Sequence, residues 1–132
     1  MLKNPDAYFA AREEVDRVCG SEKVTAKHLK DLKYINAVLR ETLRLTPTAP
    51  GFTRGPRPEN TSRPVTIANG KWEIPESGAL CLLSRIQQDP KIWGDDAKEF
   101  KPERMLDEKF DKLPKNAWKV RAYRSILVYV SY

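Results

Sequence analysis

The chain has 132 residues, of which 40% are hydrophobic and 32% charged, and this length allows one modest domain or a piece of a larger one. Lys and Arg number 24 against 18 Asp and Glu, so the formal net charge is +6 and acidic partners are favoured. No run of five like charges occurs, and aromatic residues are not interleaved with basic ones along a strand. Nucleic-acid binding is therefore not expected.

The positions of the cysteines and the hydropathy of the chain indicate its cell compartment. Cys19 and Cys81 lie far apart in the sequence and form no C-x-x-C pair, so neither a disulfide framework nor a metal site is indicated. The N-terminus lacks the apolar run of a secretory signal, and no stretch approaches the length of a membrane span. We expect a cytoplasmic chain without a membrane-spanning segment.

Helix signals dominate the first part of the chain. Asn4 is a candidate cap with Pro5 in the first turn, and the segment stops at Gly20. A shorter helical piece begins at Thr25, and a third helix ends before Pro47. Four apolar residues at three- and four-residue spacing predict the buried stripe of this third helix: Leu32, Ile35, Leu39 and Leu43.

Turn and strand signals follow. Asn69-Gly70 is a strong short hairpin signal because both residues accept positive φ. The apolar members of the predicted hairpin are Val65, Ile67, Trp72 and Ile74. Leu80 to Leu83 predict another short strand, and Asp89 is expected to cap a brief helix. The pattern predicts an α+β fold.

Glu41 and Arg44 are three residues apart on the third helix, so their side chains share a face and can form a charge-assisted bidentate pair. A motif this short arises about once by chance in a chain of this composition. A second copy, Glu14 to Arg17, is interpreted as an ordinary solvated helix pair. Only the surrounding sequence can show whether the first copy is a family motif or a chance occurrence.

That context is specific, because the prolines, the hairpin and then Phe100-Lys101-Pro102-Glu103-Arg104 follow Glu41 in order. The chain here resembles the cytochrome P-450 haem-thiolate monooxygenases. The resemblance implies part of their mainly helical fold: three N-terminal helices, a β-hairpin region, a short helix and a meander. It also implies a buried structural triad of Glu41, Arg44 and Arg104, with no catalytic residue assigned. Met105 stands where the family usually has an aromatic.

Three further segments, 43–50, 92–96 and 113–119, bring the chain nearest to the self-sufficient fatty-acid hydroxylases, whose haem domain is fused to a diflavin reductase. The resemblance implies a haem cofactor, with electrons from NADPH through FAD and FMN of a fused or separate reductase. A fatty acid or similar lipid would be hydroxylated with O₂. Thr48, Ala49 and Pro50 match a segment that passes over the haem and contributes to the substrate pocket, where the small Ala49 would leave room for an alkyl chain.

After Lys119 the family continues into the loop that carries the iron-binding cysteine, whereas this chain differs from Val120 onward. We expect a partial haem domain over residues 1–119, truncated before that loop, and a disordered or aberrant tail outside the family over residues 120–132. The oxygen-activating helix also has no counterpart, so the chain is expected to be inactive. Because every valine codon begins with G-T, a retained intron is one hypothesis for the tail.

Two other functions stay open. The chain could be a small basic module that binds an acidic protein partner or nucleic acid through its net charge. It could also be an unstable remnant with no function of its own. The uncharged, β-prone end of the tail, residues 126–132, is predicted to promote aggregation.

Overall fold

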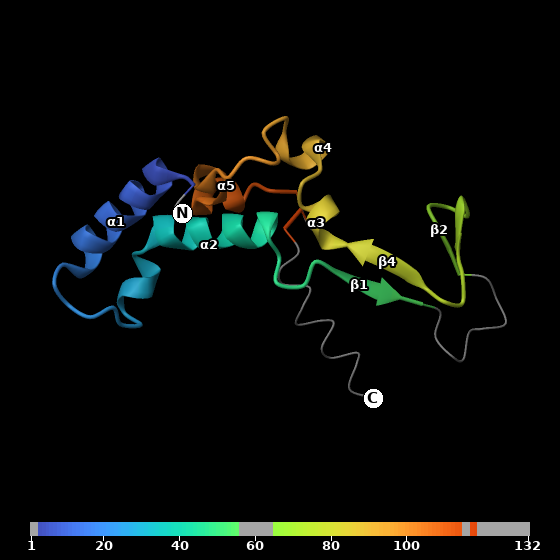
Figure 1. Cartoon of the computed structure of the whole chain (residues 1–132), viewed down its shortest axis with the longest axis horizontal. Helices are drawn as coiled ribbons and strands as arrows, with labels where there is room; N and C mark the ends of the chain where they lie inside the picture. The colour runs from blue at the N-terminus through green and yellow to red at the C-terminus, as the bar shows by residue number, and fades with distance from the viewer. Residues whose placement is uncertain (1–2, 56–64, 115–116, 119–132) are drawn as a thin grey trace.

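The computed structural model describes residues 3–55, 65–114 and 117–118. Its elements in chain order are α1 (Pro5–Cys19), the 3₁₀ helix η1 (His28–Lys30), α2 (Lys33–Leu45), β1 (Gly51–Arg54), β2 (Val65–Ile67), β3 (Trp72–Ile74), β4 (Ala79–Leu82), α3 (Leu83–Ile86), α4 (Pro90–Trp93), the 3₁₀ helix η3 (Pro102–Met105) and α5 (Asp107–Phe110). In Figure 1, α1, α2 and α5 gather at one end and the strands extend away from them. The mixed helix and strand content agrees with the predicted α+β class.

Helix α1 begins and ends close to the predicted residues, but its cap differs from the prediction. Pro5 occupies the first turn, and Gly20 follows the last turn with a φ of 57°. The side chain of Asn4 makes no capping hydrogen bond. Its backbone oxygen instead accepts the N–H of Tyr8 at 3.1 Å. The prediction of an Asn4 side-chain cap was therefore wrong, because only the main chain of this residue contacts the first turn.

Helix α2 ends before Pro47, as predicted, but its buried face is not the predicted leucine stripe. Leu39 is 55% exposed, and of the four predicted stripe residues only Leu32 is buried. The buried positions of the helix are Ala37, Val38, Glu41 and Arg44. Three- and four-residue spacing holds for both sets, so periodicity alone could not choose between them. The helix is rotated so that a charged pair faces the interior.

The strands form two separate antiparallel pairs, β1 with β4 and β2 with β3. The first pair runs in register from Gly51 opposite Leu82 to Arg54 opposite Ala79. A Cβ atom at Gly51 would lie 2.7 Å from the backbone oxygen of Cys81. Glycine is thus required at this position because the two backbones approach too closely for any side chain.

The predicted hairpin is present, with a longer turn than expected. Ile67 lies opposite Trp72, so the loop contains four residues rather than two. Ala68, Asn69 and Gly70 have φ angles of 54°, 55° and 85°. Asn69 and Gly70 tolerate this left-handed region, whereas Ala68 does so at a cost. The hairpin leaves Ile67 and Trp72 exposed.

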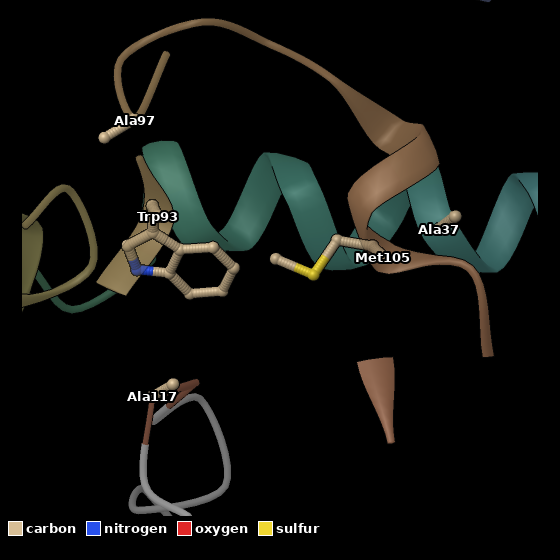
Figure 2. Close-up of a cluster of buried hydrophobic side chains, with 5 residues drawn as sticks. All are labelled: Ala37, Trp93, Ala97, Met105 and Ala117. Carbon is tan, nitrogen blue, oxygen red and sulfur yellow. The ribbon is translucent and has the colours of Figure 1, made fainter. Parts of the chain in front are cut away.

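A compact cluster forms the core between α2 and the segment after β4: Ala37, Trp93, Ala97, Met105 and Ala117. Figure 2 shows Trp93 and Met105 extended along α2, with the three alanines around them. Met105 is completely buried, so an unbranched thioether fills the place where the family usually has an aromatic ring. None of the helices within the described residues has the length and apolar character needed to span a bilayer.

Candidate functional site

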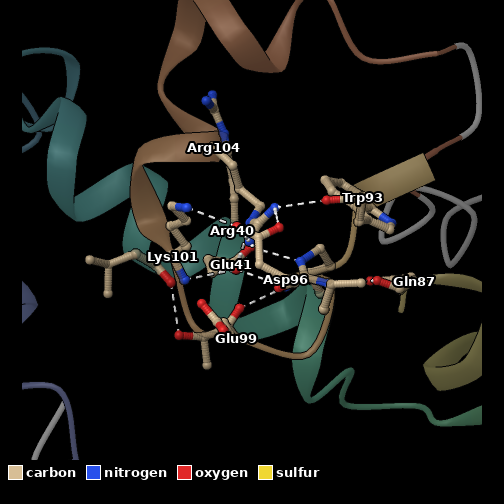
Figure 3. Close-up of polar contacts among 12 residues, drawn as sticks. Arg40, Glu41, Gln87, Trp93, Asp96, Glu99, Lys101 and Arg104 are labelled. Carbon is tan, nitrogen blue, oxygen red and sulfur yellow. Dashed lines mark hydrogen bonds and ion pairs between the residues drawn. The ribbon is translucent and has the colours of Figure 1, made fainter. Parts of the chain in front are cut away.

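Polar contacts join α2 to the segment after β4 (Figure 3). Three of them run from Arg44 to backbone oxygens of that segment. The Arg44 side chain is fully buried. Nε and Nη2 donate to the carboxylate of Glu41, each at 2.8 Å. The other donors reach backbone oxygens of Gln87 at 2.8 Å, Ala97 at 2.6 Å and Glu99 at 3.1 Å. All five guanidinium N–H groups are therefore used.

Glu41 receives more than the bidentate pair. Its carboxylate is also fully buried, and Oε1 accepts the backbone N–H of Lys101 at 3.0 Å. Nε of Arg104 lies 3.2 Å from the same oxygen, close enough for an ion pair but without hydrogen-bond alignment. The structure thus brings together Glu41, Arg44 and Arg104, the residues named from the sequence motifs, and we call these three residues the buried ion network.

Arg104 connects this network to the loop that follows α4. Nη1 donates to the backbone oxygen of Trp93 and to Oδ1 of Asp96, and Nη2 donates to the backbone oxygen of Asp96, all at 3.1 Å. Lys101 Nζ donates to the other Asp96 oxygen at 2.8 Å. The hydrogen bonds from Lys101 and Arg104 lower the pKa of Asp96 from 3.8 to about 2. Asp96 therefore stays ionised between two cations.

A buried ion pair is a strong constraint on geometry. Removing its charges from water costs on the order of several kcal/mol per ion, which only well-aligned partners offset. The guanidinium of Arg44 meets this demand through three backbone carbonyls, the Glu41 carboxylate and the ring of Trp93, whose centroid is 4.9 Å away. With both charges buried and fully engaged, the arrangement suits fixing one segment against another rather than proton transfer.

A second set of contacts joins α2 to the end of the described chain. Arg40 Nη1 donates to the backbone oxygen of Met105 at 3.0 Å and to Oδ1 of Asp107 at 2.8 Å. Its guanidinium lies 4.1 Å from the centroid of the Phe110 ring. Trp118 Nε1 donates to the backbone oxygen of Arg40 at 3.3 Å. Sequence reasoning missed Arg40, although it is adjacent to Glu41 and one helical turn before Arg44.

The second Glu-x-x-Arg copy differs from its interpretation as a solvated pair. Glu14 is only 7% exposed. Its carboxylate accepts the backbone N–H groups of Tyr34 at 2.8 Å and Ile35 at 2.9 Å. Arg17 is exposed, and the solvated pair on this helix is instead Arg12 with Asp16. The interpretation was wrong because the i, i+3 spacing within α1 does not show that Glu14 accepts backbone N–H groups of α2.

The three residues expected at a substrate pocket, Thr48, Ala49 and Pro50, connect α2 to β1. Thr48 and Pro50 are exposed and Ala49 is half-buried. The backbone oxygen of Pro50 accepts the N–H of Ser84 at 3.4 Å, which anchors this connection to α3. The structure places these residues together beside the strand pair, and their role toward a substrate stays a prediction.

Neither cysteine belongs to a group of metal ligands. Cys19 is buried in the last turn of α1, and Cys81 is half-buried in β4 opposite Phe52. Within residues 3–55, 65–114 and 117–118, no cluster of three or more His, Cys, Asp or Glu side chains could hold a metal ion. Both cysteines occupy the kind of position in which a thiol acts as a small apolar side chain.

Comparison with known proteins gives a consistent result. The family model described as cytochrome P-450 matches residues 1–119. A bifunctional cytochrome P-450/NADPH–P-450 reductase of Aspergillus oryzae is 59% identical over 121 residues, which are 90% of this chain and 11% of that protein. A bifunctional enzyme of Acremonium egyptiacum with the same description is 52% identical over 120 residues, again 90% of this chain and 11% of the relative.

A self-sufficient cytochrome P-450 monooxygenase of Oidiodendron maius is 51% identical over 120 residues, with the same shares of 90% and 11%. By their descriptions, the two bifunctional relatives combine a P-450 with its reductase in one protein. The chain therefore spans about a tenth of the length of the relatives that it matches, and it matches them within the P-450 part.

Proposed function

Because the chain belongs to the cytochrome P-450 family, we propose that it is part of the haem domain of a monooxygenase that hydroxylates fatty acids or related lipids. In such a parent protein, O₂ is the oxidant and NADPH supplies electrons through FAD and FMN of a fused or separate reductase. The relatives whose descriptions include a reductase support this assignment. Residues 1–119 would be the haem-domain part and residues 120–132 a tail outside it.

The observation that carries the proposal is the buried ion network. Glu41 and Arg44 are both fully buried, and Arg104 lies 3.2 Å from the shared Glu41 oxygen. Chance surface charges would not be desolvated together, because each unpaired buried charge is strongly destabilising. We assign these residues a structural role: they hold the segment from Trp93 to Arg104 against α2.

Haem would supply the oxygen activation in the parent protein. The described residues do not fit the iron: Cys19 is buried in the last turn of α1, and Cys81 is half-buried within the strand pair β1–β4. We therefore propose that this chain by itself forms no thiolate-ligated haem, and we assign no chemical step to its residues.

The segment Thr48, Ala49 and Pro50 is proposed to contribute to the substrate pocket of the parent. Ala49 presents a single methyl group between two residues with exposed side chains. A larger side chain at this position would reduce the room for an alkyl chain, so Ala49→Phe should shift oxidation toward shorter substrates.

A chimera tests the proposal. In the Aspergillus oryzae relative, the part matched by this chain is replaced with residues 1–119, and the product is reduced under carbon monoxide. We expect the absorption band of a thiolate-ligated haem and NADPH-dependent hydroxylation of a fatty acid. The same chimera with Glu41→Gln is the control and should lose the band.

Three outcomes count against the proposal. A chimera that folds without the thiolate band would show that these residues do not support a haem domain. A chimera with the band that oxidises NADPH but hydroxylates no lipid would contradict the substrate class. The unfused 132-residue chain, mixed with haemin, should give no such band, and its appearance would contradict the proposed absence of thiolate ligation.

A further inference from the structure

Helix α2 receives its N-terminal cap from another helix. Leu32 stands at the N-cap position and its side chain makes no capping hydrogen bond. Glu14 of α1 instead accepts the N–H groups of Tyr34 and Ile35, at 2.8 and 2.9 Å, one on each carboxylate oxygen. These are the second and third residues of the helix, whose N–H groups have no partner inside it. One carboxylate thus caps a helix that begins 19 residues later in the sequence.

The C-terminal end of α2 is capped from a distance as well. Gln87 is completely buried. The orientation of its amide is assigned from its neighbours: with the nitrogen toward the helix end, it donates to the backbone oxygens of Leu43 at 3.3 Å and Arg44 at 3.1 Å. Gln88 Nε2 donates to the backbone oxygen of Leu45 at 3.3 Å. Three of the last carbonyls of the helix, which lack partners within it, are satisfied by these two glutamines.

The chemistry of the two caps matches the ends they occupy. A carboxylate is favourable at the positive end of the helix dipole, and its two short hydrogen bonds are charge-assisted. Gln87 also links its cap to the buried ion network, because its own backbone oxygen accepts Nη1 of Arg44 at 2.8 Å. Both Glu14 and Gln87 are buried, so their hydrogen bonds do not compete with water.

We propose that Glu14 and Gln87 are positioning residues: they fix where α2 lies along its own axis and thereby hold Glu41 against Arg104. Glu41 follows Tyr34 by seven residues, a rise of about 10 Å along the helix. A small axial slip would lengthen the 3.2 Å ion pair between Glu41 and Arg104. The inference rests on the proposed function in one respect only, namely that the pair of Glu41 and Arg104 matters to a haem domain. The two caps do not depend on the proposed function.

Nuclear magnetic resonance on the full 132-residue chain tests the proposal with Glu14→Gln. Glu13→Gln is the matched control, because it makes the same change at the adjacent, exposed position of α1. In Glu14→Gln we expect amide hydrogen exchange at Tyr34 and Ile35 to be about tenfold faster, because the neutral amide keeps only one oxygen acceptor for the two N–H groups. The Arg104 Nε–H signal of the folded protein should also shift, because this atom faces Glu41 from outside α2, whereas Glu13→Gln should change neither.

The Arg104 signal separates positioning from mere stabilisation. A loss of stability reduces the amount of folded protein but leaves its resonance positions unchanged. If the Tyr34 and Ile35 signals respond while Arg104 Nε–H does not, Glu14 is only a local cap and the proposal fails. It also fails if these two amides are unprotected in the wild-type chain. Should Glu14→Gln not fold, Gln87→Met must shift the Arg104 signal in its place.

These outcomes do not depend on the chimera experiment. The exchange and resonance measurements need neither haem nor activity, so an inactive chimera would leave the positioning role intact. Conversely, an unmoved Arg104 signal would leave the monooxygenase assignment intact.

Discussion

Among single residues, Arg44 is the one whose chemistry is most constrained by its surroundings. It is fully buried and donates to one carboxylate and to three backbone oxygens from residues 87, 97 and 99. A guanidinium supplies five N–H groups in one plane, whereas an ammonium supplies three from a single atom. The position therefore requires arginine and not simply a positive charge.

Arg44→Lys should accordingly destabilise the chain even though it keeps the charge. At least one buried carbonyl would lose its donor, and each such loss costs about 1–3 kcal/mol. Urea unfolding followed by circular dichroism measures the change. Arg12→Lys is the control: Arg12 is exposed and paired with Asp16 at 2.9 Å, so the same substitution should change the stability by less than about 0.5 kcal/mol. Equal effects of the two substitutions would contradict the role of the guanidinium.

Asp96 gives the network a pH dependence. Its hydrogen bonds to Lys101 and Arg104 lower its pKa from 3.8 to about 2. A carboxylate with a lowered folded-state pKa stabilises the folded state above the unfolded pKa, and this stabilisation is lost as pH falls through the folded pKa. The stability advantage of the wild type over Asp96→Asn should thus be constant above about pH 5 and shrink between about pH 4 and pH 2. An advantage that does not depend on pH would show that Asp96 is not ionised in this contact.

At the scale of helices and strands, the sequence predicted the ends of the helices better than it predicted which face of a helix is buried. Pro5, Gly20 and Pro47 correctly bounded the first and third helices, since proline and glycine act through local backbone geometry. The buried face of α2 was not predicted, because Leu39 and Arg44 both fit a helical stripe. Burial of Arg44 depends on carbonyls more than 40 residues away, which no local pattern reveals.

The candidate site could also be predicted only in part from the sequence. Glu41, Arg44 and Arg104 were found because two short motifs occur in a specific order along the chain. Glu14 was misread because its partners are backbone N–H groups, which carry no side-chain signature. Arg40 and Gln87 were missed for the same reason: they bind main-chain oxygens, and every residue has one.

The strand pair β1–β4 depends on one glycine. A Cβ at Gly51 would meet the Cys81 backbone oxygen at 2.7 Å, so Gly51→Ala should separate the strands and cost about 1–3 kcal/mol. Gly55→Ala is the control, because its nearest contact would be an ordinary 3.6 Å. Thermal unfolding compares them. If Gly51→Ala is as stable as Gly55→Ala, the close approach of the two backbones is not a constraint.

For the whole molecule, α2 is the element that connects α1, α5 and the segment between residues 87 and 104. The N–H groups of its first turn donate to Glu14 of α1, and Arg40 contacts Asp107 at the start of α5. Its last turns carry Glu41 and Arg44, which bind the segment between residues 87 and 104. Figure 1 shows α2 running between α1 on one side and the start of the strand region on the other. Unfolding of these parts should therefore be cooperative.

The contact between Glu41 and Arg104 ties α2 to the motif around Arg104, and a double-mutant cycle measures its interaction energy directly. Glu41→Gln, Arg104→Gln and the double variant are unfolded in urea beside the wild type. Because Glu41 is fully buried and its ion pair with Arg104 spans 3.2 Å, we predict that the two single effects exceed the double effect by at least about 1 kcal/mol. Single effects that add to within about 0.5 kcal/mol would show that the two residues do not act together, and would contradict the network that ties α2 to the motif around Arg104.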